Sequence, residues 1–170
     1  MKKLTKLILS ALFAAIIAVT AITIHIPLPS GNGYLNVSDT FNILAGIVLG
    51  PAYGALAAAI GGGLSDILLG FAFYAPGTAI IKALTPVTAY FVFKAFKSHK
   101  ITGGAVASVL SEIHVPLLYF VYEYFILQYK LSAAGNIPFN FIQAGASAVF
   151  SALIISALVK SKLLDKIQKI

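Results

Sequence analysis

The chain carries no charged side chain between Leu7 and Ser38, and this uncharged stretch constrains the fold more than any other feature. Residues 7–26 are almost entirely Leu, Ile, Ala, Val and Phe, and Pro27 follows them. A hydrocarbon core about 30 Å thick needs roughly 20 apolar helical residues to cross it. The stretch therefore predicts a transmembrane helix rather than a segment of a water-soluble core.

The composition extends this prediction to the whole chain. Of its 170 residues, 59% are hydrophobic and 10% are charged, whereas about a quarter are charged in soluble domains. Because so few charges cannot coat a water-soluble surface, we expect residues 1–170 to form a single membrane domain. The chain has no cysteine and no arginine, which excludes disulfides and thiolate sites and argues against nucleic-acid recognition.

The lysines indicate how the chain crosses the membrane. Ten of the twelve form three clusters: Lys2, Lys3 and Lys6; Lys94, Lys97 and Lys100; and Lys160, Lys162, Lys166 and Lys169. The positive-inside rule favours the cytoplasmic face for all three. This placement requires the uncharged window 40–65 to be divided into two helices at Gly50-Pro51.

We therefore predict an all-α integral membrane protein with six transmembrane helices and both termini in the cytoplasm. The expected helices cover residues 5–26, 37–50, 51–70, 76–97, 102–130 and 137–162. The second helix reaches only about 21 Å at 1.5 Å per residue, so we expect its neighbours to cover it. The N-terminal lysines and the apolar run also resemble a secretory signal, although the run is longer than the usual 7–15 residues.

Small residues recur along the first and third predicted helices. In the third they occupy every fourth position over residues 50–62, which predicts close packing against other helices. In the first, Ala11 and Ala15 lie one turn apart, with Ala14 and Ala18 beside them. Two interpretations of this alanine patch remain open: packing within the bundle, or a surface offered to a partner protein.

Ionisable side chains inside a membrane cost about 2.5–3.5 kcal/mol each, so each is a candidate functional residue. The predicted topology brings most of them, with several amides and phenols, into the outer half of the bundle, where Asn32 and Tyr34 of the first external loop join them. A cavity with apolar walls and a few oriented polar groups is typical of small-molecule sites. The residues expected to bind a substrate there are Asn36, Asp39, Asp66, Tyr74, Lys82, Tyr119, Glu123, Asn140 and Gln143.

Each of these residues also has a purely structural interpretation. Asp66 and Lys82 would neutralise each other between adjacent helices, and Glu123 would reach the external headgroups. Asn140 and Gln143 would form interhelical hydrogen bonds, and the tyrosines would belong to an interfacial belt. The clustering of all of them on one side favours a binding cavity.

Glu112 and His114 lie deeper, just before a kink expected at Pro116. Glu112 is a candidate proton or cation site, which keeps open an ion-coupled carrier that works alone. A ligand-free membrane scaffold is a further alternative. The chain contains no catalytic constellation, phosphate-cradling loop or metal-binding motif, so we predict no enzymatic activity, metal or cofactor.

Several segments occur in an order that points to a known family. They are the Lys-flanked first helix with Ala11 and Ala15, Gly33–Asp39 (GYLNVSD), Leu49–Gly54 (LGPAYG), Ser65–Gly70 (SDILLG), Tyr74–Lys82 (YAPGTAIIK) and Ile137–Gln143 (IPFNFIQ). Together they resemble the substrate-binding S components of energy-coupling factor (ECF) transporters, which capture vitamins in bacteria and archaea.

The resemblance implies a plasma-membrane protein of six helices whose external vitamin pocket is capped by the first loop. It also implies that the alanine face of the first helix docks on a membrane-embedded T subunit, with two ATPase subunits below. The chain looks most like the members assigned to hydroxymethylpyrimidine or pyridoxine. The lack of tryptophan counts against thiamine. The fifth helix departs from the family pattern through Glu112, His114 and the Tyr-rich stretch 119–124, so riboflavin, pantothenate and other vitamins stay open.

Overall fold

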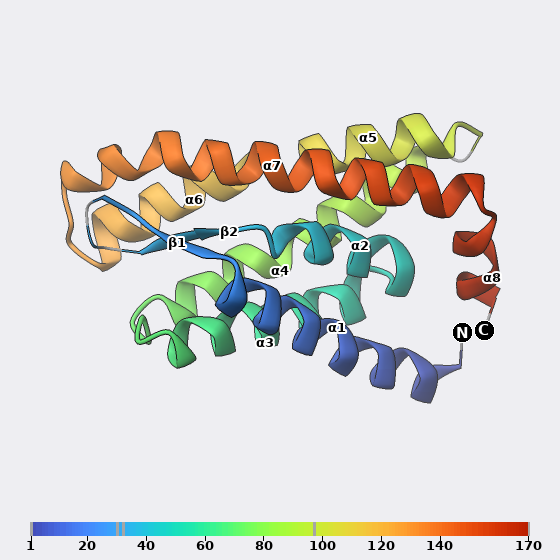
Figure 1. Cartoon of the computed structure of the whole chain (residues 1–170), viewed down its shortest axis with the longest axis horizontal. Coiled ribbons are helices and arrows are strands. Elements are labelled where there is room, and N and C mark those ends of the chain that lie inside the picture. Colours follow the sequence, from blue (N-terminus) through green and yellow to red (C-terminus); the bar gives the residue numbers. More distant parts are fainter. Residues whose placement is uncertain (1, 30, 32, 97, 170) are drawn as a thin grey trace.

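The computed structural model describes residues 2–29, 31, 33–96 and 98–169, and most of them are helical (Figure 1). Asn32 and Lys97, named above in the loop and in a lysine cluster, lie outside the described residues. The helices are α1 (Lys3–Thr23), α2 (Asp39–Leu49), α3 (Pro51–Leu68), α4 (Ala75–Ala95), α5 (Lys100–Leu110), α6 (His114–Val121), the π-helical η1 (Tyr122–Ile126), α7 (Ser132–Lys160) and α8 (Leu163–Lys169). Between α1 and α2, strands β1 (His25–Pro27) and β2 (Tyr34–Asn36) pair antiparallel.

The all-α prediction is confirmed, and three helical stretches are long and apolar enough to cross a membrane. They are Lys3–Thr23, Lys100–Ile126 and Ser132–Lys160. The other helices of the bundle, α2, α3 and α4, have 11, 18 and 21 residues. The count of six spans and the cytoplasmic position of the termini remain predictions.

Several boundaries differ from those expected. The first helix ends at Thr23 rather than at residue 26, and the following loop forms the β1–β2 hairpin. The expected helix over 102–130 is interrupted by a turn at residues 111–113. Pro116 explains this break, because a proline ring clashes with the carbonyl four residues earlier and its nitrogen donates no hydrogen bond. The C-terminal residues also form a short helix, α8, that was not predicted.

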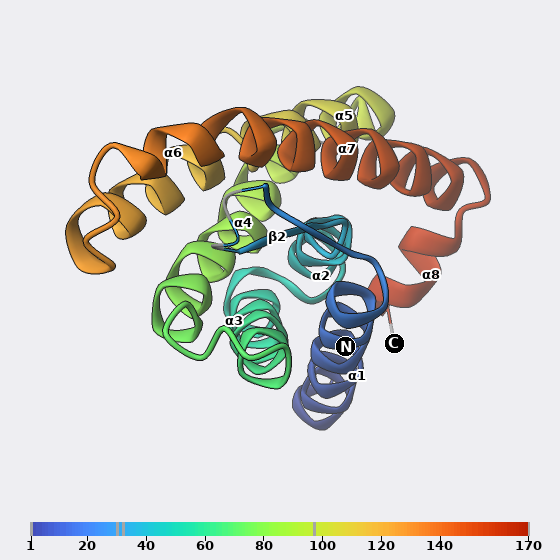
Figure 2. The ribbon, with the colours of Figure 1, turned by 60° about the vertical axis from the view of Figure 1, so that its left-hand side comes forward.

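Helix α2 occupies the centre of the bundle, packed against α1, α3, α4 and α7 (Figure 2). Ten of its eleven residues are buried, which confirms that its neighbours cover it. Gly50, with φ of +90°, forms the sharp turn into α3, a conformation that favours glycine. The division of residues 40–65 at Gly50-Pro51 is therefore confirmed.

Glycines bring α2 into backbone contact with two neighbours. A Cβ on Gly46 would lie 2.2 Å from the carbonyl oxygen of Pro86 in α4. A Cβ on Gly54 in α3 would lie 2.9 Å from the backbone of Gly46. The packing role predicted for the small residues over 50–62 is thus confirmed at Gly54. It is also confirmed at Gly62, where a Cβ would lie 3.0 Å from the side chain of Thr78.

We expect Gly46→Ala to destabilise the protein, because the added methyl group meets backbone rather than a flexible side chain. Overpacking of this kind costs about 1–3 kcal/mol. Gly145→Ala in α7 is the matched control, since a Cβ there has no neighbour within 4 Å and alanine favours a helix by up to ~1 kcal/mol over glycine. Thermal unfolding in detergent micelles, followed by circular dichroism, measures both. An unchanged unfolding temperature for Gly46→Ala would contradict the backbone contact.

Candidate functional site

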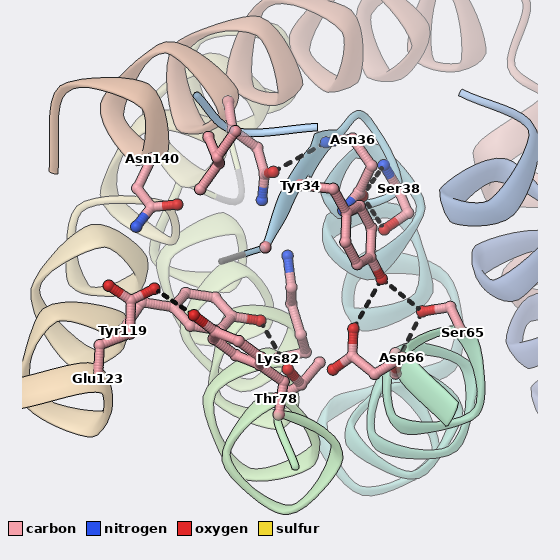
Figure 3. Close-up of a pocket in the computed structure, with 15 residues that line it drawn as sticks. Tyr34, Asn36, Ser38, Ser65, Asp66, Thr78, Lys82, Tyr119, Glu123 and Asn140 are labelled. Carbon is pink, nitrogen blue, oxygen red and sulfur yellow. Dashed lines mark hydrogen bonds between the residues drawn. The ribbon is translucent and has the colours of Figure 1, made fainter. Parts of the chain in front are cut away.

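A polar cavity lies at the end of the bundle that carries the β1–β2 hairpin (Figure 3). The hairpin, α3, α4, α6, η1 and α7 all contribute to its wall. The lining residues are Leu28, Gly33, Tyr34, Asn36, Ser38, Gly62, Ser65, Asp66, Tyr74, Thr78, Lys82, Tyr119, Glu123, Asn140 and Gln143. Eight of the nine residues predicted to bind substrate are among them, and the ninth, Asp39, contacts Lys82 behind the wall.

A buried ion pair between Lys82 and Asp39 lies at this cavity. The Lys82 ammonium donates to Oδ2 of Asp39, and the side chains are 4% and 0% exposed. Gln143 Nε2 donates to the same oxygen at 2.9 Å, and Asn42 Nδ2 donates to Oδ1 at 2.7 Å. The ammonium also lies 5.7 Å from the ring centroid of Tyr119. The alternative in which Lys82 neutralises Asp66 is therefore wrong: its ion-pair partner is Asp39.

Gln143 connects this ion pair to the hairpin. Its Oε1 accepts a hydrogen bond of 2.9 Å from the backbone N–H of Asn36 at the end of β2. The Asn36 side chain in turn accepts from the backbone N–H of Ser38 at 2.9 Å and from its hydroxyl at 2.5 Å. The segment that enters α2 is thus held to α7 by side-chain hydrogen bonds.

Tyr34 joins the hairpin to α3. Its hydroxyl donates to Asp66 Oδ1 at 2.7 Å and lies 3.4 Å from the Ser65 hydroxyl. Burial, reinforced by the nearby Asp66 carboxylate, raises the pKa of the Tyr34 phenol far above its usual value, so the phenol keeps its proton at physiological pH. Thr78 lies close to Asp66, yet Oδ2 of Asp66 receives no hydrogen bond of good geometry from a described residue.

Glu123 forms the third polar group of the cavity. It accepts hydrogen bonds of 3.0 Å from the Tyr74 hydroxyl and from Asn136 Nδ2. Burial and the Glu123 carboxylate raise the pKa of the Tyr74 phenol well above its usual value. Asn140 Nδ2, on a side chain that is 8% exposed, has no hydrogen-bond partner among the described residues. The wall thus offers an unused donor at Asn140 and an unused acceptor at Asp66.

Sequence reasoning missed several lining residues. Ser38 and Ser65 are each adjacent to a predicted site residue, and Thr78 precedes Lys82 by one helical turn. Their positions in the sequence therefore indicate that they lie near the predicted site. The Thr78 hydroxyl lies 3.0 Å from the Tyr119 hydroxyl, which joins α4 to α6 beside the cavity. The predicted site consists only of ionisable groups, amides and phenols, so these neutral hydroxyls are absent from it.

The buried ionisable groups around the cavity include more acids than bases. Four carboxyl groups, on Asp39, Asp66, Glu112 and Glu123, are at most 4% exposed, whereas Lys82 is the only buried lysine among the described residues. Glu112 does not line this cavity, and neither of its oxygens has a hydrogen-bond partner in the described part of the chain. Buried carboxyl groups therefore outnumber buried ammonium groups around the cavity.

The alanine patch of α1 divides into two faces. Ala14 and Ala18 are buried within the bundle, and Ala14 packs with Ala57 of α3. Ala11 and Ala15 are exposed. Of the four alanines predicted to contact a partner, only Ala11 and Ala15 face away from the bundle.

Comparison with known proteins identifies the family. The family model described as ECF-type riboflavin transporter, S component, matches residues 1–160. The chain belongs to this family of ECF S components. Membership makes it a transporter component rather than an enzyme, and it agrees with the resemblance inferred from the ordered segments.

Two individual proteins are similar to this S component. A solved structure described as that of the S component of a bacterial ECF transporter superposes with a TM-score of 0.65, covering 98% of this chain and 99% of the other at 23% identity; this likeness concerns the fold. An uncharacterised protein of Pyrococcus woesei is 35% identical over 66 residues, which are 39% of this chain. The match spans 44% of that relative's length.

We expect Lys82→Met to destabilise this S component by about 3–5 kcal/mol, because it leaves the buried Asp39 carboxylate without a counter-ion. The double variant Asp39→Asn/Lys82→Met is expected to recover most of this loss, since neither charge remains. Lys100→Met is the control: it breaks the Lys100–Asp165 pair, whose side chains are 39% and 47% exposed, and costs at most about 1 kcal/mol. Thermal unfolding in detergent measures all three. Equal stability of the single and double variants would exclude a stabilising ion pair.

Proposed function

We propose that the chain is the substrate-binding subunit of an ECF-type importer in a prokaryotic plasma membrane. It captures a small ring vitamin or vitamin precursor from outside and delivers it through a T subunit and two ATPases. The observation that carries the proposal is the cavity of oriented polar side chains inside an otherwise apolar bundle. In this proposal six helices span the membrane, the hairpin end faces outward, and both termini lie in the cytoplasm.

Charge favours some vitamins over others. Four buried carboxyl groups surround one buried lysine, which is already paired with Asp39, so a carboxylate ligand such as pantothenate would find no free ammonium group to pair with. A nitrogen ring with amino or hydroxyl donors suits the free acceptor on Asp66. Hydroxymethylpyrimidine and pyridoxine have this chemistry, and we propose one of them as the substrate.

Size supports the same choice. The cavity has about 40 Å³ of space open to the centres of water molecules, room for roughly three waters at ~10–15 Å³ each. The hairpin must therefore move for any vitamin to enter, which breaks contacts such as Tyr34–Asp66 and Asn36–Gln143. A single ring requires a smaller displacement than riboflavin, the three-ring vitamin in the family's name, so riboflavin is the competing ligand.

Calorimetric titration of the purified protein with a vitamin panel tests the proposal. We expect hydroxymethylpyrimidine or pyridoxine to bind with a Kd in the micromolar range or below, and pantothenate not to bind. Asp66→Asn is expected to weaken binding about 10–100-fold, the loss of a hydrogen bond to a charged group. Lys130→Gln, in the loop before α7 and outside the cavity, serves as the control. A folded protein that binds no vitamin would falsify the proposal, and tight binding of riboflavin alone would refute the substrate choice.

A second candidate function is an ion-coupled carrier that works alone. It is favoured by Glu112, a carboxyl group 2% exposed and without a hydrogen-bond partner among the described residues. Vitamin uptake by vesicles that contain only this chain, abolished by a proton or sodium ionophore, would favour this candidate. Uptake that requires the T subunit and ATP favours the first.

The exposed alanines of α1 provide a test of T-subunit docking. We expect Ala11→Leu and Ala15→Leu to leave the unfolding temperature and vitamin affinity unchanged, because both positions face away from the bundle, while co-purification with the T subunit is lost. Ala14→Leu is the matched variant on the buried face and is expected to destabilise the protein by about 1–3 kcal/mol through overpacking. Intact assembly of both exposed variants would rule out docking through this face.

A further inference from the structure

A second and wider cavity lies where the α2–α3 turn meets α1, α4, α5 and α8. Figure 1 shows α8 at the opposite end of the bundle from the β1–β2 hairpin. It has about 530 Å³ of space open to the centres of water molecules. Lys6, Lys94 and Lys100 line it, from three different helices, together with Tyr53 and Tyr90. No acidic side chain of the described residues lines it.

The three lysines are only partly engaged by the chain itself. The Lys6 ammonium lies 5.7 Å from the ring centroid of Tyr53, and that of Lys94 lies 5.5 Å from the centroid of Tyr90. A ring face satisfies one side of an ammonium and leaves its other N–H groups available. Lys100 pairs with Asp165 at 2.5 Å, but this pair is exposed and therefore weak. The cavity keeps a net positive charge after this pairing.

Two backbone carbonyls near the end of α2 have partners other than the lysines. The Ile47 carbonyl accepts a hydrogen bond of 2.9 Å from Gln168 Nε2, and the Gly46 carbonyl accepts one of 3.0 Å from the N–H of Gly50. These two acceptors are satisfied by other groups, so neither of them requires an ammonium group.

We propose that this cavity binds a phosphate group, carried by an anionic phospholipid headgroup or present as free phosphate. Lysine is a point-charge donor suited to phosphate oxygens. Basic pockets between helices at the cytoplasmic side bind anionic headgroups, and the orientation proposed above places this end of the bundle there. Ile47, Leu49 and Phe93 add an apolar wall beside the lysines, which suits the glycerol and first acyl carbons of a lipid. The site is separate from the vitamin cavity, and the proposal does not depend on vitamin binding.

Native mass spectrometry of the full chain in detergent, with added phosphatidylglycerol or phosphatidylcholine, tests the proposal. We expect the wild type to retain phosphatidylglycerol in preference. The cavity variant Lys6→Gln/Lys94→Gln/Lys100→Gln is expected to retain it at least tenfold less, because it removes three ammonium groups that converge on one headgroup, each worth roughly fivefold at such close range. The matched control, Lys2→Gln/Lys3→Gln/Lys166→Gln, removes the same charge from exposed positions outside the cavity and is expected to change retention less than threefold.

The other outcomes are also decisive. Inorganic phosphate that displaces phosphatidylglycerol in the wild type but not in the cavity variant identifies free phosphate as a ligand of the same site. Retention without such displacement identifies the lipid. Equal losses in the cavity variant and the control would overturn the proposal in favour of general surface charge. Unchanged retention together with lost T-subunit assembly would overturn it in favour of a protein interface. If the triple variant does not fold, Lys94→Gln alone, at an exposed position, provides the same comparison against Lys3→Gln.

Discussion

The ion pair between Asp39 and Lys82 organises the hairpin end of this protein. Either charge alone inside a membrane costs about 2.5–3.5 kcal/mol, whereas together they satisfy each other, with Gln143 and Asn42 as further donors to the carboxylate. Asp39 begins α2, Lys82 lies within α4, and Gln143 belongs to α7 and also holds the hairpin through Asn36. A single carboxylate therefore connects three helices and a strand. Lys82, Gln143 and Asn36 line the polar cavity, whereas Asp39 does not. The shape of the cavity therefore depends on an ion pair of which only one partner lies in its wall.

Near the ion pair, α2 approaches its neighbours more closely than ordinary side chains allow. At Gly46 the backbone of α2 meets the backbone of α4 at Pro86, one turn beyond Lys82. A Cβ on Gly62 of α3 would lie 3.3 Å from the Lys82 side chain, so α3 lies close against the base of that side chain. In a bilayer, helices gain little from burying apolar surface against one another, so close contact of this kind carries much of the packing energy. The small residues and the ion pair thus stabilise one arrangement by different means.

Much of this arrangement could be predicted from the sequence because the chain has so few charges. Lysine placement divided residues 40–65 at Gly50-Pro51, and eight of the nine predicted site residues line one cavity. The partner of Lys82 could not be predicted, since Asp39 and Asp66 are both acids near the same end and only the central position of α2 decides between them. The hairpin has strands of three residues, too short to give a periodic pattern. The two faces of the alanine patch were also indistinguishable, because Ala11, Ala14, Ala15 and Ala18 differ only in which way α1 turns toward α3.

Most of the acidic and basic side chains gather at opposite ends of the bundle. Four of its five acids, Asp39, Asp66, Glu112 and Glu123, are buried toward the hairpin end, and the fifth, Asp165, lies at the opposite end with the lysine clusters. The positive-inside rule explains exposed lysines at the ends of helices, but it does not require three of them to share a cavity with two tyrosines. Membrane insertion likewise disfavours every buried carboxyl group, so insertion cannot account for four of them beside one lysine. Orientation in the membrane thus explains where the charges lie along the bundle, and the two proposed binding sites would explain why Asp66 and Glu123 line one cavity and three lysines line the other.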